Sequence, residues 1–199
     1  MFTATRPPDP DQELVTRAQE GDTRAYDALI LKHGDRLFGL IYQMTGSRDD
    51  THDLLQDTFA KGYRSLQGFR RTANFSTWIH QIAVNLTLNF LKRRKRRQTV
   101  SLSELDETGR QDPSMVDSSL QADPERQSSL GELQKKLNEA LAQLSDAHRM
   151  VVTMFDIQGM AHAEIARILR TSEGTVRSRL HYAHLLLQSA LKDQWDERF

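Results

Sequence analysis

Residues 74–97 read NFSTWIHQIAVNLTLNFLKRRKRR, and no other stretch of the chain carries a clearer structural pattern. At 100° per residue, the pattern predicts one long helix that Asn74 or Ser76 would cap. Its apolar stripe, expected to face a core, consists of Ile79, Ile82, Ala83, Leu86 and Phe90. A separate polar stripe consists of Gln81, Asn85, Asn89, Lys92 and Arg96. The helix is therefore expected to have one buried face and one polar face.

The polar stripe has the chemistry of a nucleic-acid surface. Amide side chains can hydrogen-bond base edges, and lysine and arginine neutralise phosphates. Trp78 lies near the stripe, where an aromatic ring can stack on an unpaired base or wedge into a base step. The stripe runs into KRRKRR, six consecutive positive charges at residues 92–97. The alternatives are a solvated helix face whose cations favour the helix C-terminus, a nuclear import signal, and a core position for Trp78.

The charge that balances the basic run lies directly after it. The 199-residue chain has 27 basic and 27 acidic side chains, and residues 98–130 alone hold seven acidic and two basic ones. That segment is also rich in serine and contains Pro113 and Pro124. We therefore expect a flexible acidic linker at residues 98–130. Residues 1–10 are proline-rich and are expected to form a disordered tail.

On both sides of this linker the apolar residues recur at helical spacing, and glycine and proline are sparse. The sequence therefore predicts an all-α fold with two small helical domains, at residues 11–97 and 131–199. Within the first domain, helix breaks are expected near Gly21 and Asp22 and near Gly46 and Ser47.

Composition argues against several classes of protein. The chain has no cysteine, which excludes disulfides and thiolate metal sites and fits a reducing cytosol. It shows no apolar run of the ~20 residues that a membrane span needs, and no secretory signal, so we expect a cytoplasmic protein without a membrane partner. His181 and His184 lie one helical turn apart, but no carboxylate lies beside them as a third ligand. Phosphate-loop and nucleophile motifs are absent, so we predict no enzymatic activity, no metal and no cofactor.

Residues 159–187, GMAHAEIARILRTSEGTVRSRLHYAHLLL, predict a helix, a short polar turn and a second helix. Thr171 or Ser172 would cap the second helix. The apolar positions are Ile165, Ala166 and Leu169 in the first helix, and Val176, Leu180, Ala183 and Leu187 in the second. The outward residues of the second helix are then Arg177, Ser178, His181 and His184. This pattern is typical of a helix-turn-helix that places its second helix in a DNA major groove, with an ordinary helical hairpin as the alternative.

Three blocks together resemble a known family, the group 4 or extracytoplasmic-function (ECF) sigma factors of the sigma-70 family. The first block is HDLLQDTFAKGYRSLQGF at residues 52–69, which resembles the helix that docks on RNA polymerase. The second is FSTWIHQIAVNLTLNFLKRR at residues 75–94, which resembles the segment that opens and reads the −10 promoter element. The third, residues 144–187, resembles region 4, which reads the −35 element.

The resemblance implies a role for individual residues. Contacts to core polymerase are implied for Asp53, Leu54, Leu55, Gln56, Asp57 and Phe59. Contacts to the −10 element are implied for Asn74, Phe75, Ser76, Trp78, Gln81, Asn85 and Asn89, and the basic run extends this set with Lys92, Arg93, Arg94, Arg96 and Arg97. Contacts to the −35 element are implied for Thr175, Arg177, Ser178, Arg179 and His181, and the shared outward stripe adds His184.

As a sigma factor, the chain would bind core polymerase at the β′ clamp helices and the β flap. It would direct the enzyme to promoters and assist DNA melting, without an active site of its own. The acidic linker would follow the RNA-exit path, and an anti-sigma factor is an expected partner. A self-sufficient helix-turn-helix regulator is the main alternative, but it would leave the 53–59 block and the linker unexplained. A scaffold protein would leave KRRKRR unexplained.

The sequence departs from the family pattern in three places. Thr51 and His52 stand where an Ala-Glu pair is usual, and Arg170 stands where the turn of region 4 usually has glycine. Tyr182 and His184 replace two arginines in the second half of the recognition helix. The last change removes two fixed positive charges, which puts the strength of −35 recognition in question.

Overall fold

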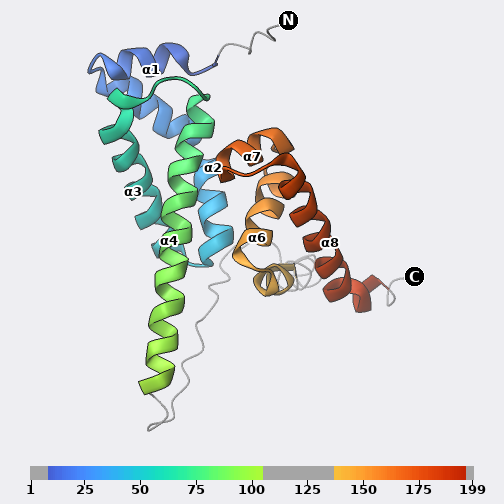
Figure 1. The fold of residues 1–199 in the computed structure, drawn as a ribbon. Helices are drawn as coiled ribbons and strands as arrows, with labels where there is room; N and C mark the ends of the chain where they lie inside the picture. Colours follow the sequence, from blue (N-terminus) through green and yellow to red (C-terminus); the bar gives the residue numbers. More distant parts are fainter. Residues whose placement is uncertain (1–8, 105–136, 196–199) are drawn as a thin grey trace, which may run out of the picture. The chain divides into compact units, whose positions relative to one another are not determined.

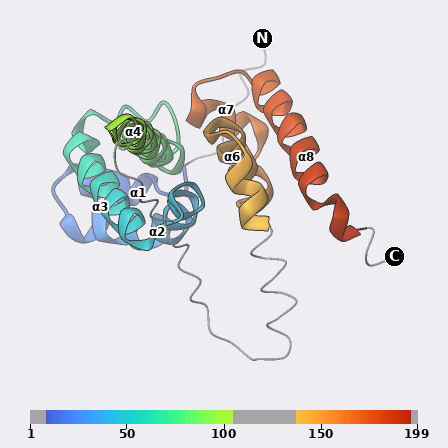
Figure 2. The same cartoon turned by 90° about the horizontal axis from the view of Figure 1, so that it is seen from below.

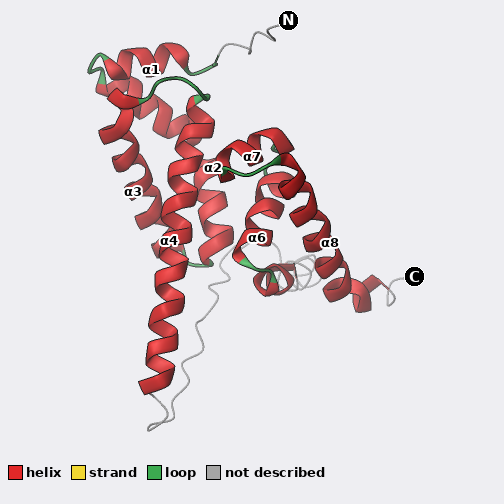
Figure 3. Cartoon of the chain, in the orientation of Figure 1, coloured by secondary structure: helices red, strands yellow, loops and turns green. Residues whose placement is uncertain are grey.

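The structure, a computed structural model, describes residues 9–104 and 137–195. These ranges contain helices and connecting turns and no strand (Figure 3). The chain divides into two compact units, Met1–Glu107 and Thr108–Phe199. The predicted all-α fold with two helical domains is confirmed. Residues 1–8 of the expected disordered tail and residues 105–130 of the expected acidic linker lie outside the described residues.

The first unit is a bundle of three long helices with a short helix across one end (Figures 1 and 2). Its elements are α1 (Gln12–Gln19), α2 (Thr23–Thr45), α3 (Arg48–Ser65), the 3-10 turn η1 (Leu66–Gly68) and α4 (Phe75–Glu104). Both α2 and α4 run antiparallel to α3, and α1 lies at the end where α4 begins (Figure 1).

The junctions between these helices follow local sequence chemistry. The Asp22 side chain accepts hydrogen bonds from the backbone N–H groups of Arg24 and Ala25, which caps α2. Gly46 ends α2 in the left-handed conformation, with φ 68°, and the Ser47 hydroxyl then caps α3. Both predicted helix breaks are therefore confirmed.

The core of the first unit lies between α2, α3 and α4. Of the predicted apolar stripe, Ile79 and Ala83 are fully buried, whereas Ile82, Leu86 and Phe90 pack partly buried against the same cluster. A second face of α4 is also buried, and it consists of Thr77, His80, Val84, Thr87 and Leu91. The core face is wider than predicted because α4 contacts both α2 and α3.

Gly62 allows the three long helices to approach closely. A Cβ atom at this position would lie 2.7 Å from the Tyr26 hydroxyl and 2.8 Å from Cδ1 of Ile79. The Tyr26 hydroxyl is held in place because it donates a 2.7 Å hydrogen bond to the carbonyl of Phe59, and burial raises its pKa. Any side chain at position 62 would therefore push α2 or α4 away from α3.

The second unit contains a helical stretch at residues 137–143, then α6 (Asp146–Val152), a π-helix (Thr153–Ile157), α7 (His162–Leu169) and α8 (Glu173–Trp195). Arg149 caps the C-terminal end of the helix at residues 137–143. Its guanidinium donates to the carbonyls of Leu141, Ala142 and Leu144. Burial lowers the pKa of Arg149. The fully buried core consists of Val151, Met154, Ile165, Val176 and Ala183.

The structure differs from the sequence prediction near two boundaries. The sequence placed the end of the first domain at Arg97, but α4 continues through Glu104, so the first seven residues of the expected linker are helical. The sequence also placed residues 1–10 in a disordered tail. Asp9, however, accepts hydrogen bonds from the backbone N–H groups of Asp11 and Phe75 and so belongs to the folded unit.

Candidate nucleic-acid interface

The outer face of α4 carries the predicted polar stripe. Asn85, Asn89, Lys92 and Arg96 are exposed, and Gln81 is half-buried at the upper end of the row. The C-terminal part of α4 extends past the other helices of the first unit (Figure 1). The row therefore forms one continuous surface, with amide side chains followed by cationic ones. Such a surface could contact bases and phosphates along one nucleic-acid strand.

The six basic residues of this helix do not all have the same environment. Lys92, Arg93, Arg96 and Arg97 are exposed. Arg94 is half-buried, donates to the Thr45 carbonyl at 3.2 Å and lies 3.9 Å from a carboxylate oxygen of Asp50. Arg94 thus connects α4 to the α2–α3 corner, and its guanidinium is less available to DNA than predicted.

The first turn of α4 is more buried than the sequence suggested. Phe75 is 0% exposed and packs beside the His33 ring, so the prediction that its side chain contacts DNA conflicts with its place in the core. Trp78 is half-buried, with its ring 4.8 Å from that of Phe69 and 5.6 Å from that of Phe75. Trp78 therefore belongs to the core edge, and only part of its ring is accessible to a base.

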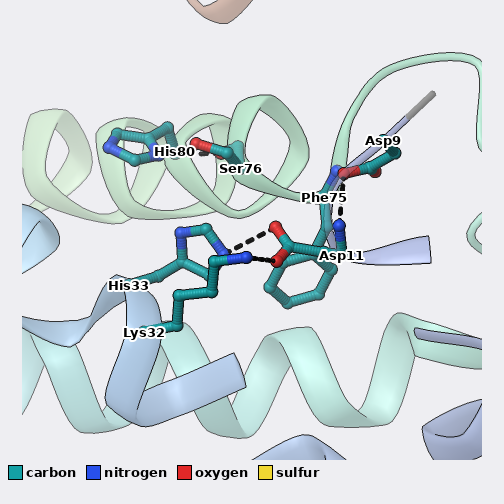
Figure 4. Close-up of polar contacts among 7 residues, drawn as sticks. All are labelled: Asp9, Asp11, Lys32, His33, Phe75, Ser76 and His80. Carbon is teal, nitrogen blue, oxygen red and sulfur yellow. Dashed lines mark hydrogen bonds and ion pairs between the residues drawn. The ribbon is translucent and has the colours of Figure 1, made fainter. Parts of the chain in front are cut away.

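Asn74 occupies the N-cap position of α4, because the helix begins at Phe75 and the N–H of Trp78 donates to the Asn74 carbonyl. Asn74 and Ser76 are both half-buried. Ser76 lies inside the first turn, where its carbonyl accepts a 2.7 Å hydrogen bond from Nδ1 of His80 (Figure 4). Burial lowers the pKa of His80 to about 4, so the ring is neutral at pH 7 and does not add to the positive charge of α4.

A network of polar side chains supports this helix start from the N-terminal segment. The buried carboxylate of Asp11 accepts hydrogen bonds from Lys32 and from Nε2 of His33, the latter at 2.8 Å (Figure 4). The neighbouring Asp9 reaches the backbone of Phe75 at 2.7 Å. Sequence reasoning missed both aspartates, because contacts between residues 21, 22 and 66 positions apart leave no periodic signal.

The polymerase-docking residues implied by the resemblance fall into two groups. Asp53, Gln56 and Asp57 are exposed on α3, and Leu55 is partly buried. Leu54 and Phe59, in contrast, are 7% and 6% exposed and belong to the core cluster, so their assignment as contact residues conflicts with the structure.

The exposed acids of α3 form a longer row than predicted. Asp49 is also exposed and lies one helical turn before Asp53, which in turn lies one turn before Asp57. Thr51, one of the residues that depart from the family pattern, does not belong to this exposed row. It is buried, and its hydroxyl donates to the Ser47 carbonyl at 2.6 Å. The face that remains exposed is therefore acidic and polar.

In the second unit, α7 and α8 form the predicted helix-turn-helix. Ser172 provides the cap, since its hydroxyl oxygen accepts the N–H of Thr175 at 3.0 Å. In α8, the predicted apolar positions Val176, Leu180 and Ala183 are buried, and Leu187 is half-buried. In α7, the buried residues are Ile165, Ala166 and Ile168, and Leu169 is half-buried. Of the implied −35 residues, Arg177, Ser178, His181 and His184 are exposed, and Thr175 and Arg179 are half-buried.

His184 has a partner that the sequence did not reveal. Its Nε2 lies 2.8 Å from a carboxylate oxygen of Asp156, which belongs to the π-helix. A DNA phosphate would have to compete with this carboxylate, so the predicted phosphate contact of His184 conflicts with the observed pairing. Tyr182, the other departure from the family pattern, is 58% exposed beside the ring of His181.

Arg170 adopts the left-handed conformation at the turn between α7 and α8, with φ 51° and ψ 49°. This geometry explains why glycine suits the position, since a side chain in this region carries a steric cost of about 1 kcal/mol. We expect Arg170→Gly to raise the free energy of unfolding of the second unit by about 1 kcal/mol in chemical denaturation. Arg170→Ala, which removes the same charge and keeps a Cβ, is the control. Equal stability of the two variants would contradict the prediction.

Neither residues 9–104 nor residues 137–195 bring together three or more side chains able to hold a metal ion. Among the helices in those ranges, none combines the length and the apolar character that crossing a bilayer demands.

Known proteins share both the sequence and the fold of this chain. Residues 29–97 match the family model Sigma-70 region 2, and residues 134–183 match Sigma-70, region 4. The RNA polymerase sigma-H factor of Pseudomonas aeruginosa is 34% identical over 184 residues, which cover 92% of this chain and 94% of the relative. The ECF RNA polymerase sigma-E factor of Haemophilus influenzae is 30% identical over 186 residues, covering 92% and 95%.

Two solved structures show the same fold at lower sequence identity. CnrH, solved in complex with the cytosolic domain of CnrY, has a TM-score of 0.66 and 23% identity, and the match covers 92% of this chain and 97% of that one. The sigma factor RpoE of Bartonella quintana, solved with the anti-sigma factor NepR, has a TM-score of 0.61 and 20% identity over 84% of this chain and 96% of that one. With both family models matched in order along the chain, this protein belongs to the sigma-70 family, in the ECF group of RNA polymerase sigma factors.

Proposed function

We propose that this chain binds core RNA polymerase, directs it to promoters by contacts with the −10 and −35 elements, and assists strand opening at the −10 element. The observation that carries the proposal is the outer face of α4, where exposed Asn85 and Asn89 lead directly to exposed Lys92 and Arg96. Amides beside cations on one helix face suit base edges and their phosphates together. Trp78 is half-buried at the edge of the core, and the accessible part of its ring is suited to stack on a base exposed by melting.

The exposed faces of α3 and α8 are proposed to contact polymerase and the −35 element. The acidic row of α3, with Asp53 and Asp57 at its centre, would dock on the β′ clamp helices of polymerase. The exposed residues of α8, with Arg177 and His181, would contact the −35 major groove while the second unit contacts the β flap. Polymerase supplies the catalytic groups, and the protein acts in the cytoplasm, where the enzyme transcribes DNA.

An anti-sigma factor completes the proposed set of partners. The sigma factor RpoE of Bartonella quintana, whose fold this chain shares, was solved with the anti-sigma factor NepR. We propose that a protein of this class covers the exposed faces of α3 and of the second unit and so keeps the chain from core polymerase.

Run-off transcription tests the proposal directly. Core polymerase is incubated with fragmented genomic DNA of the source bacterium, with and without the purified full chain, and the 5′ ends of the transcripts are sequenced. We expect discrete start sites that require the chain and share sequence at −10 and −35. Identical transcripts without the chain would refute the proposal. Tight, sequence-specific DNA binding by the free chain at physiological salt would instead support the helix-turn-helix regulator.

A further inference from the structure

The loop that precedes α4, residues 69–74, is held at its start by α1. Nε2 of Gln19 donates to the carbonyls of Leu66 and Phe69, at 2.9 and 3.2 Å. In return, Nε2 of Gln67 donates to the Gln19 carbonyl at 2.6 Å. One side chain near the C-terminal end of α1 therefore fixes the backbone at the point where this loop begins.

The other end of the loop is held by the residues just before α1. The Asp9 carboxylate accepts the N–H of Phe75 at 2.7 Å and the N–H of Asp11 at 3.0 Å (Figure 4). The N–H of Phe75 is one of the first donors of α4, which have no partner inside their own helix, and a negative charge is favourable there. Asp9 thus caps α4 from a segment that is remote in sequence.

The middle of the loop is held by a third contact. Nη2 of Arg71 donates to the Thr16 hydroxyl at 2.8 Å and to Oε1 of Gln19 at 2.9 Å. Arg71 has a φ of 57°, a conformation that costs energy for a residue with a side chain and persists where surrounding contacts enforce it. A cleft of about 200 Å³ lies beside these contacts and is lined by residues of α1, of the segment before it and of the loop, among them Gln12, Val15 and Ala73.

All three contacts come from one short segment, residues 9–19, and all three set the position of the residues that lead into the proposed −10 face. Building on the function proposed for α4, we propose that Asp9, Gln19 and Arg71 are positioning residues for −10 recognition. They act through the backbone of the loop and of Phe75, and they thereby determine where Asn74 and Trp78 meet the DNA.

A positioning role and a purely structural role predict different losses. If these residues only stabilise the fold, their replacement lowers the folded fraction and weakens the binding of every promoter equally. If they position the loop, the folded variant keeps its affinity for polymerase and its −35 preference but discriminates less between −10 sequences. Preference within one DNA library is therefore the informative measurement, because it is independent of the active concentration.

The test uses holoenzyme reconstituted from core polymerase and the full chain. One DNA library randomises the −10 element of a promoter found by run-off transcription, a second randomises its −35 element, and bound DNA is sequenced. We expect Asp9→Ala and Gln19→Met each to reduce the ratio between preferred and disfavoured −10 sequences about five- to tenfold, the effect of losing one or two hydrogen bonds. The −35 ratio should not change. Asp9→Asn, which keeps one acceptor oxygen for Phe75, should lie closer to wild type than Asp9→Ala.

Arg17→Gln is the matched control. Arg17 lies on the same helix and makes two comparably short bonds, at 3.0 and 2.7 Å, but they go to Asp22 and not to the loop. This variant should keep both preferences. An unchanged −10 ratio in Gln19→Met, or an equal loss at −10 and −35, would overturn the positioning role. If Asp9→Ala does not fold, the −10 ratios of Gln19→Met and Arg71→Gln test the positioning role in its place. A wild-type holoenzyme without −10 preference would instead refute the proposed function itself.

Discussion

Replacing both Asp53 and Asp57 by lysine is expected to weaken the binding of the full chain to core RNA polymerase by about 100-fold or more. The two carboxylates are exposed on α3, one helical turn apart, and belong to the face proposed to dock on the enzyme. Reversing two charges at a polar interface replaces attraction by repulsion, and each unfavourable like-charge pair costs several kcal/mol. Titration of fluorescently labelled chain with core polymerase measures the loss.

The structure also defines which variants would not test this interface. Leu54 and Phe59 lie in the core, so their replacement would unfold the first unit whether or not α3 docks on polymerase. The matched control is the double variant Asp27→Lys and Asp35→Lys, which reverses two exposed charges on α2. We expect the control to bind core polymerase almost as wild type does. A similar loss in both double variants would indicate a general charge effect and would exclude a specific role for α3.

The second large effect is expected at the C-terminal end of α4. Replacing Lys92, Arg93, Arg96 and Arg97 by glutamine should weaken promoter binding by holoenzyme on the order of 100-fold near 0.15 M salt, to a similar extent for different promoters. The plot of log affinity against log salt should also become less steep, by up to ~0.9 for each phosphate contact that is lost. Filter binding or fluorescence anisotropy over a salt series measures both quantities.

Arg94 is left out of this variant because it donates to the Thr45 carbonyl and lies near Asp50, so its loss would alter the α2–α3 corner as well as the charge. A control removes three exposed cations of the first unit that lie outside α3 and α4, namely Arg17, Arg24 and Arg36. The control should largely keep the salt dependence of the wild type. If the α4 variant retains the wild-type slope, its cations are not in contact with DNA.

Periodicity in the sequence was sufficient to predict that the chain folds into two helical units, but not where the first unit ends. The polar row of α4 and the buried row of α8 each follow from helical spacing within one segment. The observed exposure agrees with both predictions except at Gln81 and Leu187, which are half-buried. Periodicity was less informative where a helix has two neighbours. Thr77, His80 and Thr87 of α4 are buried because α4 packs on both α2 and α3, and a one-sided pattern does not predict this arrangement.

The contact residues were harder to predict than the segments that carry them. The resemblance to sigma factors implied contact roles for α3 and for the start of α4, but it did not separate their exposed residues from Phe59 and Phe75, which are buried. Pairs between distant elements gave no signal at all. His184 and Asp156 are 28 positions apart, and neither residue type is unusual on an exposed helix face.

The cap that Asp9 provides for α4 has a consequence for the order of events during synthesis. Asp9 leaves the ribosome early, but its partner Phe75 is translated 66 residues later, and the α4 residues that complete the core follow still later. In a nascent chain that ends after α3, Asp9 therefore lacks its hydrogen-bond partner Phe75. The core residues that α4 would cover are then exposed on one side. The first unit reaches its final form only once α4 has left the exit tunnel, so its N-terminal segment is exposed to chaperones and proteases until then.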